Sequence, residues 1–338
     1  MSEMSRSKAF AQTCLMVLVL LIVVLAPFWI AGLFWSNVFV ASIPGLFAAT
    51  LGAALGGFRH GVRLGAFLAA LTALGIMAHP WPLAGALVMA VAAILPAVDA
   101  RKGLHNASVV VPIQLGFVVV APPALAAGMG SSPSHVSGAI VTAIVVLAGG
   151  LWGAACAWYL MRNKPRPKAE GLSREISVIY GLVLAVSLGV STWAVLKWDS
   201  GGYGAWVMLT IGLMLRPSMH ETWQRSRHRV GGTLLGLATS GLLVTLVTDA
   251  QAQGILALLF MVVAGATMIL GKPYWVFVTF LTPGIILSTV AGKPATGAEE
   301  QRLLFTLVGV VAAILMVLLG AAVMRLRHPE LRIKKSPG

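Results

Sequence analysis

Long apolar runs separated by short charged connections fill almost the whole chain. Only 10% of the 338 residues are charged and 58% are hydrophobic, whereas about 25% of a soluble domain is charged. A bilayer-spanning helix needs about 20 mostly apolar residues, while a transmembrane barrel shows alternating stretches of about ten. The continuous runs therefore exclude a soluble globule and a barrel. They predict an all-α polytopic membrane protein.

The apolar runs, read between charges and turn residues, predict about twelve transmembrane helices. No connection between them is long enough for an extramembrane domain. In the first half the runs span residues 14–35, 38–57, 62–78, 83–98, 106–126 and 137–161. In the second half they span residues 176–196, 200–216, 231–248, 253–270, 274–291 and 303–325. The fourth and eighth runs are the short ones.

The cations fall almost entirely in alternate connections. If the N-terminus is cytoplasmic, all but three of the 24 Lys and Arg residues lie on the cytoplasmic side, and the other side holds only Lys197, Lys293 and Arg302. Cytoplasmic loops carry most of the Lys and Arg residues, so both termini are predicted to be cytoplasmic. An even number of spans agrees with this, since it places both termini on the same side. The net charge of +14 is thus a topological signal. A nucleic-acid partner is not expected, because no basic domain stands clear of the bilayer.

A loose internal repeat relates the two halves of the chain. Residues 63–66 align with residues 229–232, and Gly116 aligns with Gly284. Six spans in each half predict two parallel six-helix repeats related by an axis along the membrane normal. Chance similarity between glycine-rich helices is the alternative. The predicted parts are a first half at 1–161, a basic cytoplasmic linker at 162–175, a second half at 176–325 and a basic cytoplasmic tail at 326–338.

Polar groups that converge for catalysis are scarce in the predicted spans. Charged residues such as Asp99 and Lys197 fall at span ends, and the seven histidines are expected in solvated loops. A catalytic site needs convergent partners, and no Cys/His spacing resembles a metal site. We therefore expect no enzyme activity, cofactor or metal. An integral membrane transferase is disfavoured for the same reason.

Prolines interrupt the fifth and eleventh spans at corresponding places, which predicts a substrate site between the halves. A proline inside a helix removes a hydrogen bond and clashes with the preceding turn. Interrupted spans at matching positions point to a transport site near mid-membrane. The alternative is two bent helices whose polar groups are satisfied by neighbours. The candidate substrate-binding residues are Pro112, Gln114, Gly116, Thr279, Thr282, Pro283 and Gly284.

A basic stretch precedes the ninth span. Pro217 suits the first turn of a helix, on which Arg225 and Arg229 would share one face. With Arg216, they predict a cytoplasmic vestibule that concentrates organic anions. In the span itself, Gly232 and Gly236 form a small-xxx-small pair that lets another helix approach closely. The alternative reading is helix packing plus an orientation anchor.

The same stretch carries a family resemblance. Arg216-Pro217-Ser218, followed by Arg229-x-x-Gly232-Thr233-x-x-Gly236, resembles the fusaric acid resistance and aromatic acid exporter (FUSC) family of bacterial inner-membrane proteins. The resemblance covers about residues 202–291. It implies an exporter of aromatic or other weak organic acids that works with a periplasmic membrane-fusion adaptor and forms a homodimer. Larger relatives carry cytoplasmic domains, where this chain has only the short linker.

These observations favour a secondary exporter of small organic anions in the bacterial cytoplasmic membrane, working by alternating access between the halves. Asp99, or a proton carried by the weak acid itself, would provide the coupling. A non-transporting anchor or regulatory subunit of a larger envelope complex is the alternative. The anchor predicts that alanine at Gln114 or Thr282 has no effect, whereas changes at Gly232 or Gly236 disrupt assembly.

Overall fold

The computed structural model describes residues 3–35, 37–123, 125, 136–163, 170–198, 204–217, 219–290, 304, 307–316, 318–319 and 322. No β-strand occurs within these residues. The helices in the first part of the chain are α1 (Glu3–Phe34), α2 (Val38–Gly56), α3 (Phe58–Ala78), α4 (Pro82–Ala92), α5 (Ile94–Ala100), α6 (His105–Ser108) and α7 (Val110–Val120). They are followed by α8 (Val136–Met161), α9 (Arg174–Trp198), α10 (Ala205–Met214), α11 (Met219–Leu246), α12 (Ala250–Ile269) and α13 (Tyr274–Val290).

The helical, multi-pass character predicted from the apolar runs is confirmed. Within the described residues, eight helical stretches are long and apolar enough to cross a bilayer. Shorter apolar helices lie at His105–Val120, Ala205–Met214, Tyr274–Ser288 and Leu307–Met316. The ten residues of α10 reach about 15 Å, roughly half the hydrocarbon thickness. The eighth span is therefore short, as predicted, whereas the fourth lies in an apolar stretch of 19 residues, Pro82–Ala100, and is not short. The total of twelve remains a prediction.

Prolines account for the break in the fifth predicted span. The helix is interrupted between Ser108 and Val110, and Ser108 is four residues before Pro112, whose ring would clash with that carbonyl in a continuous helix. Pro96 stands in the same relation to the end of α4. In contrast, α13 continues through Pro283. Of the two corresponding prolines, Pro112 thus follows a break in its helix, whereas Pro283 lies inside a continuous one.

The helices group into two compact units. One comprises Val24–Thr222 and Val311–Gly338, and the other comprises Met1–Val23 and Trp223–Val310. We call them the α2–α10 unit and the α11–α13 unit. The chain boundaries of these units differ from those of the predicted halves, and the two six-helix repeats remain a prediction.

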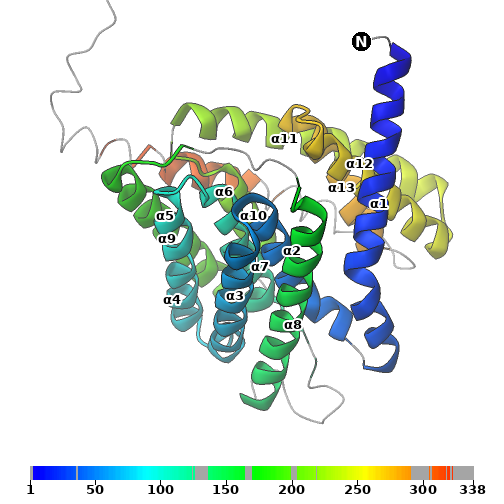
Figure 1. The fold of residues 1–338 in the computed structure, drawn as a ribbon. Helices are drawn as coiled ribbons and strands as arrows, with labels where there is room; N and C mark the ends of the chain where they lie inside the picture. The colour runs from blue at the N-terminus through cyan, green and yellow to red at the C-terminus, as the bar shows by residue number, and fades with distance from the viewer. Residues whose placement is uncertain are drawn as a thin grey trace, which may run out of the picture. The chain divides into compact units, whose positions relative to one another are not determined.

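In the α2–α10 unit, α2, α3 and α8 pack against one another (Figure 1). A Cβ at Gly45 of α2 would lie 1.9 Å from the carbonyl oxygen of Val146 on α8, so only glycine permits this approach. Buried alanines fill the rest of the contact between α2 and α8. Around this core, α4 packs against α9, and α7 packs against α3 and α10.

In the α11–α13 unit, α12 packs along α13. The first part of α1 joins this unit, where Val17 forms a buried cluster with Val262 and Ala266 of α12. Leucines on the outward side of α11, such as Leu242 and Leu246, are more than half exposed. Large exposed apolar surfaces of this kind mark a lipid-facing or protein-facing surface.

Candidate functional site

The buried face of α11 is polar. Ser226, Arg229, Thr233, Gly236 and Ser240 are all buried, and their spacing of three or four residues places them on one side of the helix. The exposed side of the same helix carries leucines. A soluble helix shows the opposite arrangement, whereas polar residues of membrane helices face the bundle interior or an internal pathway. We call these five residues the α11 seam.

Arg229 is the unusual member of the seam. Its side chain is 1% exposed, and its Nε and Nη1 atoms have no hydrogen-bond partner among the described residues. The hydroxyl of Ser226, one turn earlier, also has none there. Burying an unpaired charge is costly. The seam therefore presents unsatisfied donors suited to an anion.

Close packing brings α13 onto the seam. A Cβ at Gly232 would lie 2.6 Å from the Trp275 carbonyl oxygen, and one at Gly236 would lie 2.5 Å from the Cβ of Thr282. Thr282 is buried, and its hydroxyl has no partner within the described part of the chain. The hydroxyl of Thr279 donates to the Trp275 carbonyl at 2.9 Å. Gly232 and Gly236 thus allow α13 to approach α11 closely, with Thr282 against Gly236.

The N-terminal end of α13 adds an aromatic ring near the arginines. The guanidinium of Arg225 lies 5.5 Å from the ring centroid of Tyr274, a cation–π distance. The Tyr274 hydroxyl is buried and has no partner among the residues described. Since Arg225 precedes Arg229 by one turn, this end of the seam combines two guanidinium groups, a phenol and a serine hydroxyl.

Of the other predicted site residues, Pro283 and Gly284 lie in α13, and the rest belong to the α2–α10 unit. Arg216 is 6% exposed, and its Nη1 donates to the side-chain oxygen of Asn106. Gln114 is half-buried in α7, and a Cβ at Gly116 would lie 2.9 Å from the Cβ of Met208. Pro112 lies in the first turn of α7. A joint site of these residues with α13 remains a prediction.

Two expectations about polar residues need correction. Arg216 and Arg229 were expected to line a vestibule at the cytoplasmic surface, but the side chains of both are buried. His60 was expected in a solvated loop, but it lies in α3 and is 8% exposed. Burial of these side chains depends on helix packing between distant segments, which spacing along the chain does not reveal. In the sequence, the seam is a row of small and hydroxyl residues in register with Arg229, a pattern that charge alone does not reveal.

Asp99 is buried completely and fully partnered. Arg63 Nη2 donates to its Oδ1, and the Ser108 hydroxyl donates to its Oδ2. The imidazole of His60 lies alongside, with Nε2 3.9 Å from Asp99 Oδ2. The last turn of α5 and the first turns of α3 and α6 supply these groups. The predicted span-end carboxylate is thus the centre of a polar cluster inside the α2–α10 unit.

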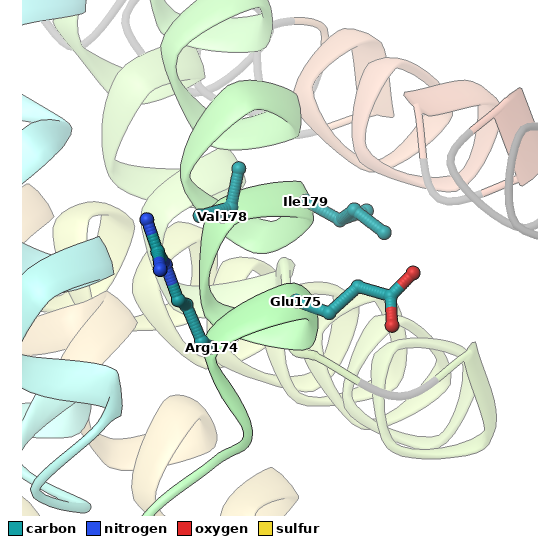
Figure 2. A pocket seen from close by; sticks show the side chains of 4 residues that line it. All are labelled: Arg174, Glu175, Val178 and Ile179. Carbon is teal, nitrogen blue, oxygen red and sulfur yellow. The ribbon is translucent and has the colours of Figure 1, made fainter.

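The start of α9 forms a hollow of about 340 Å³ lined by Arg174, Glu175, Val178 and Ile179 (Figure 2). Figure 2 shows the Arg174 and Glu175 side chains on opposite sides of the helix. Because these charges do not converge, the hollow has no arrangement suited to one ligand. It contains none of the predicted site residues.

Comparison with known proteins places the seam in a recognised module. A family described as fusaric acid resistance protein-like matches residues 182–316, a longer segment than the 202–291 that carried the resemblance. The chain is also similar to the uncharacterized protein slr1298 of Synechocystis sp., with 32% identity over 130 residues, which are 38% of this chain and 16% of that protein. The matched part is thus a small fraction of that relative's length. No solved structure matches the chain. Through residues 182–316, fewer than half of the chain, this multi-pass helical membrane protein is similar to the fusaric acid resistance protein-like family.

Proposed function

We propose that the chain is a membrane transporter that exports aromatic or other weak organic acids. The observation that carries the proposal is the buried Arg229, whose Nε and Nη1 atoms have no partner among the described residues. It lies on a polar helix face within the family-matched segment. A buried guanidinium in a membrane helix is retained at a cost, and such residues usually serve function.

The chemistry of the seam favours a carboxylate as the ligand. An ionised carboxylate only accepts hydrogen bonds, and an arginine only donates them. The Nε and Nη donors of an arginine form charge-assisted hydrogen bonds with carboxylate oxygens. Hydroxyls of Ser226 and Thr282 add donors, and the Tyr274 ring offers an apolar face for an attached aromatic group. A cation would find no counter-charge among the five seam residues.

We also propose a transport mechanism, a location and partners for the chain. Alternating access between two halves would expose the seam to each side in turn, and Gln114 of α7 is proposed as a further substrate contact. The bacterial cytoplasmic membrane, with both termini inside, is the proposed location because the cations lie in alternate connections. A periplasmic membrane-fusion adaptor and a homodimer are the proposed partners, on the family resemblance.

A strain that lacks the chain tests the proposal directly. We expect it to grow poorly on at least one member of a panel of aromatic carboxylic acids and to regain growth when the wild-type chain is restored. Arg229→Gln should reduce efflux of that acid at least tenfold. Arg227→Gln is the matched control, since Arg227 lies on α11 but is exposed, and it should retain wild-type efflux. An uncoupler added during efflux reports whether the proton gradient drives it.

The outcomes separate transport from anchoring. If neither growth nor efflux changes for any acid, the exporter proposal fails. The close packing of Gly232 and Gly236 against α13 favours the alternative, a membrane anchor or regulatory subunit of a larger envelope complex. An anchor would tolerate alanine at Gln114 and Thr282 and would lose its partner complex on changes at Gly232 or Gly236. An exporter would lose efflux in both sets.

A further inference from the structure

We propose that His60 is a proton-binding site in which Arg63 holds the neutral imidazole and Asp99 receives the protonated one. The site lies where α3, α5 and α6 meet in the α2–α10 unit. It uses no residue of the α11 seam. The inference therefore stands whether or not the chain transports organic acids.

The hydrogen bond from Arg63 fixes the protonation state of the ring. Arg63 Nη2 lies 2.9 Å from His60 Nδ1. A guanidinium has only donors, so Nδ1 must be the acceptor. The imidazole proton is then on Nε2, and the ring is neutral. The same Nη2 atom also donates to Asp99, so Arg63 ties the histidine to the carboxylate.

The opposite edge of the ring has an unused donor directed at Asp99. Nε2 of His60 is buried and has no hydrogen-bond partner within the described residues. It lies 3.9 Å from Asp99 Oδ2, too far for a hydrogen bond. A buried donor without a partner is costly. A small movement of the ring toward α5 would satisfy it.

Protonation supplies the reason for that movement. A proton on Nδ1 turns this atom into a donor facing the Arg63 donor, so their hydrogen bond cannot persist. The charged groups around the ring are Arg63, Asp99 and Lys102. The new cation is repelled by Arg63 and Lys102 and attracted by Asp99. On the α2 side, Gly56 lies directly against the ring, where a Cβ would be only 2.4 Å from His60 Cδ2, which leaves the α5 side as the direction of movement.

Asp99 acts as the fixed counter-charge in this scheme. Both of its oxygens already accept hydrogen bonds, from Arg63 and Ser108. The proton therefore arrives at His60 Nδ1, and the contact that breaks is the one between His60 and Arg63. Acidification should release Arg63 from the histidine, and a return to higher pH should restore the bond. This refines the sequence-based expectation that Asp99 itself is the coupling residue.

Nuclear magnetic resonance of the full chain in lipid nanodiscs tests the site. With ¹⁵N-labelled histidine and arginine side chains, the wild-type chain at pH 8 should show His60 with an unprotonated Nδ1 and a protonated Nε2. Lowering the pH to 5 should protonate Nδ1 and change the Arg63 side-chain signal in the same titration step. His60→Gln identifies the signal and should abolish the Arg63 change. His220→Gln, at an exposed position, is the matched control and should leave it intact.

Assignment does not depend on one variant, because the other six histidines can be replaced singly and the His60 signal found by elimination. Arg63→Gln should leave His60 with a mixture of both neutral tautomers. A proton on Nδ1 at pH 8, an absence of titration between pH 5 and 8, or a titration that leaves the Arg63 signal unchanged would each overturn the proposal. The cluster would then be a structural clamp only.

Discussion

Asp99 and Arg229 are both buried charges in a membrane protein, but their surroundings differ. In the α2–α10 unit, Asp99 is bonded through both oxygens to Arg63 and Ser108. In the α11–α13 unit, Arg229 is 1% exposed, and two of its nitrogens lack a partner within the described residues. A buried charge whose partners are all present depends on them, because removing one partner leaves an uncompensated charge in the interior. One whose donors remain unused is expected to bind something else.

The largest effect expected from this contrast is at Arg63. Arg63→Met leaves the Asp99 carboxylate buried without its counter-charge, which should lower the free energy of unfolding by about 3–5 kcal/mol. Denaturant unfolding of the chain in detergent micelles measures it. The double variant Arg63→Met with Asp99→Asn removes both charges and should recover part of the loss. If Arg63→Met lowers the free energy of unfolding by less than about 1 kcal/mol, the buried Asp99 carboxylate does not need Arg63 as its counter-charge.

The packing that supports the seam should be the next most sensitive feature. Gly236→Ala places a methyl group 2.5 Å from the Cβ of Thr282, an overpacking that should cost about 1–3 kcal/mol. Gly231→Ala is the control on the same helix, because a Cβ added there has no neighbour within 4 Å among the described residues outside its own stretch of helix. It should be neutral or stabilising by up to about 1 kcal/mol. Equal losses in the two variants would show that α11 does not approach α13 closely.

A smaller effect of opposite sign is expected at Arg229. Arg229→Met removes a buried charge whose Nε and Nη1 have no partner among the described residues. Because methionine keeps much of the side-chain volume, the free energy of unfolding should rise by about 1 kcal/mol. The same unfolding measurement compares it directly with Arg63→Met. A loss of more than about 1 kcal/mol would mean that protein groups already satisfy Arg229. Asp99 and Arg229 would then no longer differ in whether the protein itself satisfies the buried charge.

The smallest effect is expected at Tyr274. Tyr274→Phe removes a hydroxyl that has no partner among the described residues and keeps the ring beside Arg225, so stability should change by less than about 0.5 kcal/mol. Tyr274→Leu also removes the ring and should cost about 0.5–1 kcal/mol more. Thermal unfolding of the two variants side by side separates ring from hydroxyl. Equal stability would show that the cation–π contact contributes nothing.

The sequence predicted the helical membrane class because hydropathy is a local property. The break before Pro112 also followed from local chemistry, since a proline ring acts on the carbonyl four residues earlier. The family resemblance began from Arg216-Pro217-Ser218 and the glycines of α11, and the matched segment includes both. These features need no knowledge of distant contacts.

Burial of individual polar residues did not follow from the sequence. His60 and Asp99 are far apart along the chain, and only the packing of α3 against the end of α5 brings them together. The continuous helix from Met219 to Leu246 also differs from the expected surface segment leading into a span. The high charge between Arg216 and Arg229 suggested solvent exposure, whereas both of these arginines are buried.

Ligand binding by the purified chain tests most directly whether Arg229, whose Nε and Nη1 have no partner among the described residues, binds an anion. Benzoate, an aromatic carboxylate, should raise the midpoint of thermal unfolding of the wild-type chain in a concentration-dependent way, whereas the uncharged amide benzamide should not. Arg229→Met should abolish the benzoate shift while remaining folded. A shift of the same size in this variant, or an equal response to benzamide, would contradict the assignment of an anion site to the α11 seam.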